Sequence, residues 1–256
     1  MPAVFPAKNA ATWLGLTAEL DIIAASGRTA EFWWRDDDAT RPGAALDRLL
    51  RIAQSRALAL AVIPQGATAA LARHLEGVDN VTVLQHGFAH ANHAPASQKK
   101  AEFGPHRPLP AMLREIDDGR ARLEDLFADR FLPVFVPPWN RIADDLPAAL
   151  MARGYRGVSC FGRRPPEAAR YIMNCHVDPI DWRGSRGFAG VGQALKPLIG
   201  QLAAGPVATP PEPLGILTHH RDHDCGGWRF IEDLLAATRD HPAVEWRSAS
   251  NIAAGF

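Results

Sequence analysis

Residues 81–90 have the sequence VTVLQHGFAH, and the organisation of the whole chain can be worked out from this stretch. Residues 81–84 are apolar or β-branched and predict a buried strand, and Gly87 then interrupts the run. His86 and His90 are four residues apart. On a helical turn, side chains at this spacing share a face, so both imidazoles could point at one atom. Histidine pairs of this kind commonly hold zinc, although most are ordinary surface or core residues.

A second predicted strand ends in acidic residues. Residues 31–34 (EFWW) predict an aromatic strand that runs directly into Arg35 and the acidic run 36–38 (DDD). Three adjacent carboxylates at the end of a buried strand repel one another unless a cation is present, although an acidic turn that caps the next helix would also explain them. One aspartate together with His86 and His90 would make a set of two histidines and one carboxylate. Such a set is typical of a catalytic zinc site, which keeps a further position open for water.

The composition is that of a globular protein with no expected nucleic-acid or membrane partner. Of the 256 residues, 47% are apolar and 22% are charged, and 28 basic residues balance 28 acidic ones. No run of about 18 apolar residues occurs, and the N-terminal sequence lacks the basic-then-apolar order of a signal peptide. Cys160, Cys175 and Cys225 are few, odd in number and widely spaced, which indicates reduced thiols and predicts a cytoplasmic protein.

Strand-like and helix-like segments alternate along the chain. Strands are expected at 31–35, 58–63, 81–84, 132–136, 157–161, 172–177, 214–218 and 244–247. Helices are expected at 9–26, 44–57, 68–76, 111–127, 144–153, 193–204 and 228–239, with a proline-rich connector at 206–213. This alternation predicts an α/β fold, with residues 1–256 as a single domain built as a distorted (β/α) barrel of about seven parallel strands. Residues 91–110 contain four prolines and are expected to form an irregular rim or lid over the site.

Polar and aromatic residues fall at the carboxyl ends of five predicted strands. They are the run 36–38, His86, the pair Trp139-Asn140, the segment 178–182 and the pair His219-His220. In a parallel barrel these strand ends share one face, and active sites are built on that face. We therefore expect the five groups to meet at one rim.

In this order, five segments resemble the sequence motifs of the NodB-type polysaccharide deacetylases, which are metal-dependent carbohydrate esterases. Residues 35–38 (RDDD) resemble the paired-aspartate motif, and residues 86–90 (HGFAH) resemble the His-x-x-x-His motif. Residues 135–139 (FVPPW) resemble the Phe-Arg-Pro-Pro-aromatic motif. Residues 178–182 (DPIDW) resemble the Asp-x-x-Asp-Trp segment, and residues 216–219 (ILTH) resemble the closing Leu-x-His motif.

The resemblance implies a metal-dependent hydrolase that removes acetyl groups from an N- or O-acetylated substrate, either a small molecule or an oligosaccharide. It implies that Asp37, His86 and His90 hold the metal, which is expected to be Zn²⁺ or another divalent transition metal. Asp36 would then be the general base that deprotonates the attacking water.

The same resemblance implies that His219 is the general acid that protonates the leaving group. Asp181 would orient or tune the imidazole of His219. The side chains of Trp139 and Trp182 could stack on a sugar ring or simply pack under the rim. The residues expected to bind substrate are Trp139, Asn140 and Trp182.

Two departures from the family pattern indicate a divergent branch. Val136 stands where the family has the arginine that holds the base aspartate, and Arg35 or Arg141 could replace it. Asp38 stands where the family has a glycine, so the register of the acidic run is open. Asp37 and Asp38 could instead be the base and the metal ligand.

Two other functions remain open at this point. The first is a cytoplasmic amidase that acts on a C–N bond of a small non-sugar molecule on the same scaffold. The second is a catalytically silent carbohydrate-binding protein, which would have kept the rim and lost turnover together with the arginine.

Overall fold

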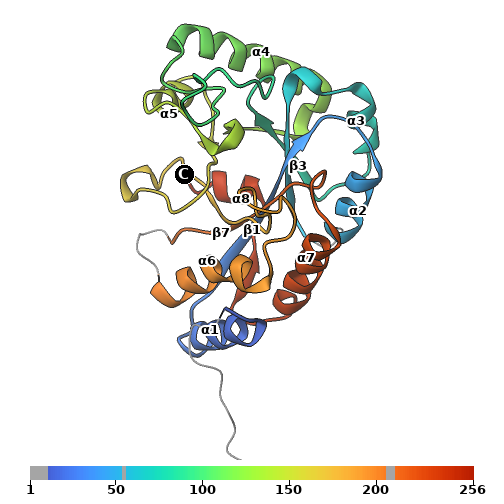
Figure 1. Ribbon diagram of the computed structural model, residues 1–256, viewed down its shortest axis with the longest axis vertical. Coiled ribbons are helices and arrows are strands. Elements are labelled where there is room, and N and C mark those ends of the chain that lie inside the picture. The colour runs from blue at the N-terminus through green and yellow to red at the C-terminus, as the bar shows by residue number, and fades with distance from the viewer. Residues whose placement is uncertain (1–10, 54–55, 206–210) are drawn as a thin grey trace, which may run out of the picture.

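A curled sheet of parallel strands forms the centre of the molecule (Figure 1). The computed structural model describes residues 11–53, 56–205 and 211–256. The strands are β1 (Ala30–Ala39), β2 (Leu58–Val62), β3 (Val81–His86), β4 (Phe131–Val136), β5 (Gly157–Val158), β6 (Cys175–Val177), β7 (Leu214–Thr218) and β8 (Val244–Trp246). Their order is β5-β4-β3-β2-β1-β7-β6, and β8 pairs with the first residues of β1. All of these pairings are parallel.

The two ends of this strand order come together through isolated bridges. Val158 pairs with Ile172, and Phe161 pairs with Cys175, both in the parallel sense. The N–H of Cys175 also donates a hydrogen bond to the carbonyl of Cys160 at 2.9 Å. Because these contacts join the segment after β5 to the segment that enters β6, the sheet curls into a distorted barrel. The predicted α/β fold with about seven parallel strands is confirmed.

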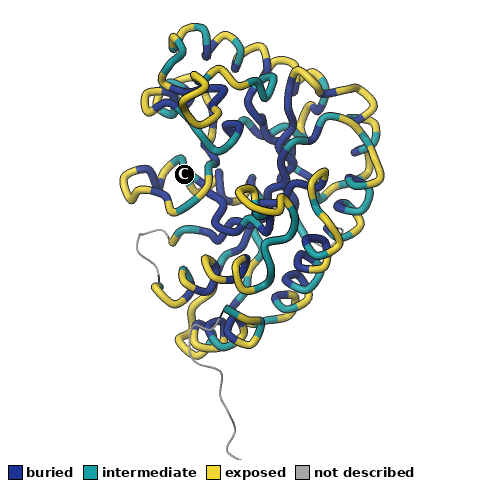
Figure 2. Tube along the Cα trace, viewed as in Figure 1, coloured by how far each residue is buried: buried dark blue, intermediate teal, exposed yellow. Residues whose placement is uncertain are grey.

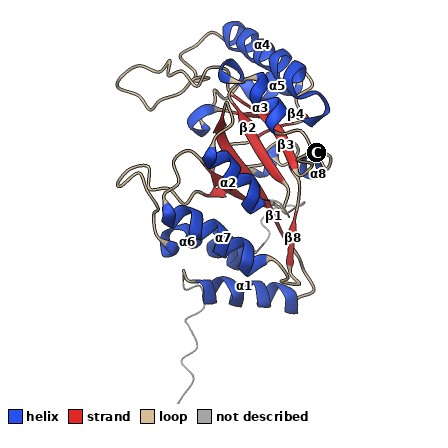
Figure 3. Cartoon of the chain, turned by 90° about the vertical axis from the view of Figure 1, so that its right-hand side faces the viewer, coloured by secondary structure: helices blue, strands red, loops and turns tan. Residues whose placement is uncertain are grey.

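Helices cover the outside of the sheet, and Figure 3 shows α1 beside α6 and α7. The helices are α1 (Trp13–Ala25), α2 (Ala44–Ala53), α3 (Ala69–His74), α4 (Leu109–Phe127), α5 (Leu146–Met151), α6 (Val191–Ala204), α7 (Cys225–Thr238) and α8 (Ala249–Ala253). Short 3₁₀ helices are η1 (Pro64–Gly66), η2 (Ala128–Arg130), η3 (Pro138–Asn140) and η4 (Pro166–Ala168). Side-chain oxygens of Thr12, Thr68, Asp224 and Ser248 cap α1, α3, α7 and α8, because each accepts a hydrogen bond from a first-turn N–H. No described helix is both long and apolar enough to cross a membrane.

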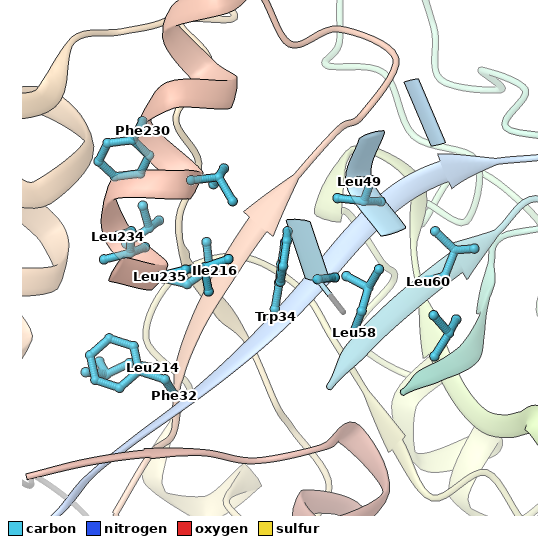
Figure 4. Packing of buried hydrophobic residues seen from close by; sticks show 14 of the residues in the cluster. Phe32, Trp34, Leu49, Leu58, Leu60, Leu214, Ile216, Phe230, Leu234 and Leu235 are labelled. Atoms are coloured by element: carbon cyan, nitrogen blue, oxygen red, sulfur yellow. The ribbon is translucent and has the colours of Figure 1, made fainter. Parts of the chain in front are cut away.

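Both faces of β1 are buried, and the alternation of its side chains separates two layers of core. Phe32 and Trp34 face outward and pack in one cluster with Phe230 and Leu234 of α7 (Figure 4). Trp33 belongs to a second cluster, which fills the inside of the curled sheet. Figure 2 shows that buried residues follow the strands, whereas exposed residues lie on the surrounding helices and loops. The same alternation continues through Arg35, Asp36 and Asp37.

Most expected elements are present with shifted bounds. β1 continues to Ala39, beyond the expected end at residue 35, because its polar end still pairs with β2 and β7. The expected strands 157–161 and 172–177 are reduced to β5 and β6, and the remainder of each makes only single bridges. Helix α6 continues through Pro197. Residues 9–10 and 54–55 of two expected helices and residues 206–210 of the expected connector lie outside the described residues.

The close approach of β7 to its neighbours gives a testable prediction about stability. A methyl group at Gly215 would overlap Nε1 of Trp33 and the backbone of Asn174 and Cys175, whereas one at Gly200 in α6 would meet nothing within 4 Å. We expect Gly215→Ala to lower the free energy of unfolding by about 1–3 kcal/mol through overpacking. Gly200→Ala should raise it by up to about 1 kcal/mol, because alanine favours helix. Urea denaturation measures both, and equal effects of the two substitutions would contradict this account.

Candidate active site and metal centre

Asp38, His86 and His90 come together at the carboxyl ends of β1 and β3. Nε2 of His86 lies 3.1 Å from Oδ1 of Asp38, and Nε2 of His90 lies 3.4 Å from the same oxygen. One potential ligand atom from each residue lies within 4.8 Å of the other two. Among the described residues, this is the group of histidine, cysteine and acidic side chains that is compact enough to hold a metal ion.

A β-bulge directs Asp38 toward the histidines. Asp36 pairs with Leu60 and Ala39 pairs with Val62, so β1 has two residues where β2 has one. Asp38 has a φ of 72°, a left-handed conformation that aspartate tolerates better than most residues. The regular alternation of side chains along a strand would therefore predict the wrong direction for the side chain of Asp38.

The imidazole of His86 is held in the orientation that a metal ligand needs. Its Nδ1 donates a hydrogen bond to the carbonyl of Val136 at 3.0 Å, which leaves Nε2 for Asp38. Burial lowers the pKa of His86, but the nearby carboxylates of Asp37 and Asp38 outweigh it, and the pKa is raised. Burial raises the pKa of Asp38, yet the hydrogen bond and charge of His86 outweigh that effect and lower it. An ionised carboxylate and an imidazole nitrogen that face each other need a proton or a cation between them, so this donor set fits a divalent metal.

His90 reaches the site by a route that differs from the expected one. β3 ends at His86, and the following residues form no helix, so the two imidazoles do not meet on a helical turn. Gly87 (φ 58°) and His90 (φ 56°) both have left-handed backbones, and this tight turn brings the two rings to a centroid distance of 5.1 Å. Such a conformation in histidine costs on the order of 1–3 kcal/mol and persists only where the surroundings enforce it. The ring of Trp139 packs on His90 at 4.3 Å.

The close side-chain contacts of Asp37 are with Arg35 and not with a histidine. Nε and Nη2 of Arg35 lie 2.9 and 3.0 Å from the two carboxylate oxygens of Asp37, and both side chains are buried. Burial lowers the pKa of Arg35, but the charge of Asp37 outweighs it and raises the pKa, so the guanidinium stays charged. Nη1 of Arg35 donates to Oγ of Ser159 at 2.6 Å, and its Nη2 donates to Oδ1 of Asn140 at 2.7 Å. Asn140, which was expected to bind substrate, therefore uses its amide oxygen to hold Arg35.

The two arginines that could replace the one missing at position 136 have different contacts. Arg141 donates to the carbonyl of Lys100 at 2.6 Å, away from the aspartates. Arg35 alone of the two candidates contacts a carboxylate of the acidic run. The sequence contained a signal for this contact, since an arginine directly before three aspartates on a buried strand must find an anionic partner.

Asp36, the expected base, lies on the other side of β1 from Asp37. Its Oδ2 accepts hydrogen bonds from Oγ1 of Thr218 at 2.6 Å and from the N–H of His220 at 3.0 Å. Nδ1 of His220 lies 2.5 Å from the other carboxylate oxygen. Burial lowers the pKa of His220, but the charge of Asp36 outweighs it and raises the pKa. The carboxylate of Asp36 is thus occupied with tying β1 to the end of β7.

His219 faces Asp178 rather than Asp181. Nδ1 of His219 lies 3.9 Å from Oδ2 of Asp178, and Trp182 donates its Nε1–H to that same oxygen at 2.7 Å. The rings of Trp182 and His219 are nearly perpendicular, with their centroids 4.8 Å apart. The Oδ1 atom of Asp181 instead accepts hydrogen bonds from the N–H groups of residues 183 and 184, so this carboxylate stabilises a turn. Burial raises the pKa of Asp178.

The molecule is a distorted parallel barrel with a candidate metal site at its rim. No protein-family model and no curated protein matches the sequence. Solved structures do match it. A protein from Mycobacterium smegmatis assigned as a polysaccharide deacetylase has a TM-score of 0.65 at 14% identity, over 89% of this chain and 90% of that one.

Two further solved structures have the same fold. A CE4 esterase from Streptococcus mutans gives a TM-score of 0.59 at 13% identity, over 90% of each chain. A family 4 acetyl xylan esterase from Clostridium thermocellum, solved with a cobalt ion, gives 0.53 at 14% identity, over 87% of this chain and 89% of that one. The chain therefore has the fold of the polysaccharide deacetylases, and the resemblance inferred from its five motifs is confirmed at this level, with the low identity expected of a divergent branch.

The three aspartates give a prediction about metal binding. We expect Asp38→Asn to weaken Zn²⁺ binding by more than the roughly 10–100-fold that loss of an outer partner typically costs, because it removes a ligand atom. Asp37→Asn should have a smaller effect, because Asp37 contacts Arg35 and no histidine. Asp36→Asn is the matched control and should leave the affinity unchanged. Isothermal titration calorimetry measures all three, and a larger loss for Asp37→Asn than for Asp38→Asn would return the ligand role to Asp37.

Proposed function

We propose that this protein is a divalent-metal hydrolase that removes an acetyl group from an N- or O-acetylated substrate. The observation that carries the proposal is the convergence of three functional groups at one barrel rim. These groups are the metal-type set Asp38–His86–His90, the carboxylate of Asp37 and the imidazole of His219.

In this proposal Asp38, His86 and His90 hold the metal. A divalent cation at such a site acts as a Lewis acid and lowers the pKa of water to about 7. Asp37 is the general base that accepts a proton from the attacking water. Arg35 binds both oxygens of Asp37 and so holds the carboxylate in one orientation.

The leaving group is handled on the other side of the rim. His219 donates a proton to the departing amine or alcohol. Asp178 faces His219 across 3.9 Å, and Trp182 limits the movement of both side chains through its contacts with them. These assignments shift the base by one position from Asp36 to Asp37, and the orienting residue from Asp181 to Asp178.

The substrate class is inferred from the rim and from the structural relatives. Trp139 packs on His90 and Trp182 contacts His219, so an indole stands on each side of the proposed reaction centre. Trp182 is 37% exposed and is available to stack against a sugar ring. One relative of the same fold is named as an acetyl xylan esterase and was solved with cobalt, which supports an acetylated carbohydrate and a transition metal such as Zn²⁺. A cytoplasmic location stays a prediction.

The structure weakens the case for a catalytically silent carbohydrate-binding protein. It was raised because the family's arginine is missing at Val136. Arg35 supplies a guanidinium to Asp37 from β1 itself, so the site retains a buried, charge-stabilised carboxylate. Among the described residues, no contact favours a small non-sugar amide over an acetylated sugar.

The general acid is tested by comparing leaving groups. Wild-type protein should hydrolyse both an aryl acetate and an N-acetyl sugar, and a chelator should abolish both activities. We expect His219→Ala to lower turnover of the N-acetyl substrate by about 10²–10⁴-fold and to affect the aryl acetate far less, because an activated phenol leaves without a proton. Asp178→Asn should act in the same direction more weakly, whereas the control Asp181→Asn should not. Equal loss on both substrates would make His219 structural, and a wild type without metal-dependent turnover would reject the proposal.

The role of Arg35 is tested by Arg35→Lys. Lysine keeps the positive charge but cannot bind two carboxylate oxygens in parallel, so the carboxylate of Asp37 should no longer be held in one orientation. We expect kcat to fall by at least about tenfold while Zn²⁺ remains bound. Metal analysis of the purified variant alongside steady-state kinetics measures both quantities. Unchanged kcat would remove Arg35 from the mechanism.

A further inference from the structure

The turn that carries His90 has no helical hydrogen bonds, so its peptide groups must find other partners. The N–H of Gly87 donates to the carbonyl of Val136 at 3.0 Å. The carbonyl of Phe88 accepts from the N–H of Gln65 at 2.9 Å. Three further N–H groups of the turn point toward a single side chain, Glu102.

Glu102 belongs to segment 91–108, the irregular part of the 91–110 stretch that was expected to form a rim or lid, and its side chain is fully buried. Its Oε2 accepts from the N–H of Phe88 at 3.2 Å. Its Oε1 accepts from the N–H groups of Ala89 and Ala91 at 2.7 and 3.4 Å. His90 lies between these two alanines, so one carboxylate oxygen holds the peptide groups on both sides of the proposed ligand.

Other contacts hold the same turn from its opposite side. Nε2 of Gln85 donates to the carbonyl of Gly87 at 3.1 Å, and Oε1 of Gln85 accepts from the hydroxyl of Tyr155 at 2.6 Å. A Cβ atom at Gly87 would overlap both Oε2 of Glu102 and the ring of Pro138, so the turn packs directly against the carboxylate. These contacts enforce the left-handed backbone that turns His90 back toward His86.

We propose that Glu102 is a positioning residue of the metal centre, an inference that rests on the proposed metal site of Asp38, His86 and His90. Its carboxylate presents His90 to the metal by binding the turn on both sides of that histidine. It does not contact the metal ligands through its own side chain. Segment 91–108 therefore functions as a clamp on the metal site.

The test replaces Glu102 with glutamine, which has the same shape. One of its two terminal atoms becomes an NH₂ group that faces a backbone N–H, so at least one of the two anchoring sides is lost in either orientation. We expect Glu102→Gln to weaken Co²⁺ and Zn²⁺ binding by about 10–100-fold, the usual effect of removing an outer partner of a metal ligand. The visible absorption spectrum of bound Co²⁺ should change as well, because one imidazole leaves its position.

The matched control is Glu115→Gln. Glu115 pairs with Arg107 at 2.5 Å, and Arg107 donates to the backbone carbonyl of Glu102. The hydrogen bonds of this pair do not involve the peptide groups of the turn that carries His90. We expect its Co²⁺ affinity and spectrum to match those of the wild type. Glu102→Asp provides a second variant if the glutamine variant does not fold. It keeps the charge on a shorter stem, and an intermediate loss of affinity is expected.

A double-mutant cycle separates positioning from a general loss of structure. If Glu102 acts through His90, Glu102→Gln should have no further effect on Co²⁺ affinity in a His90→Ala background. An equal loss in the presence and absence of His90 would overturn the inference, as would unchanged affinity and an unchanged spectrum in Glu102→Gln. Failure of the wild type to bind Co²⁺ or Zn²⁺ would overturn the metal site itself, and the inference with it.

Discussion

The rest of the candidate site depends on a charge buried inside the barrel at the end of β1. The guanidinium of Arg35 is fully buried, and removing one partner from such a group typically costs about 3–5 kcal/mol, so its contacts matter for stability. Asp37 takes two of its contacts, and Ser159 and Asn140 take the others. These partners come from β1 itself and from the ends of β5 and β4. One side chain thus determines how three segments at the rim lie relative to one another.

The sequence predicts the fold well because apolar strands that are buried on both faces leave a strong pattern. Residues 58–62, 81–86, 131–136 and 214–218 are such runs, and each forms a strand close to its expected bounds. The positions of His86 and the 219–220 pair at strand ends also follow from that pattern. The weakest expectations were the strands at 157–161 and 172–177, where the sheet closes through single bridges that have no sequence period.

Within the site, the sequence predicts which segments meet but not which atoms face each other. The bulge in β1 and the left-handed turn at His90 are backbone features, and neither one follows from the period of the strand. The interpretation of Asp181 as the partner of His219 failed for a similar reason, because a tight turn after residue 180 uses that carboxylate for its own N–H groups. Glu102 could not be found at all, since it lies in a segment without any periodic pattern and its partners are peptide N–H groups.

The three aspartates of β1 have three different sets of partners, although they are consecutive and chemically identical. Asp36 binds the end of β7, Asp37 binds Arg35, and Asp38 faces two histidines. In an alignment of letters, a run of three equal residues can slide by one position with little change in score. Equivalence between this strand end and the strand end of a distant relative is therefore defined by partners, a guanidinium for one carboxylate and imidazoles for another. The same reasoning allows an arginine to stand on a different strand of the barrel, provided that its guanidinium still reaches the same carboxylate.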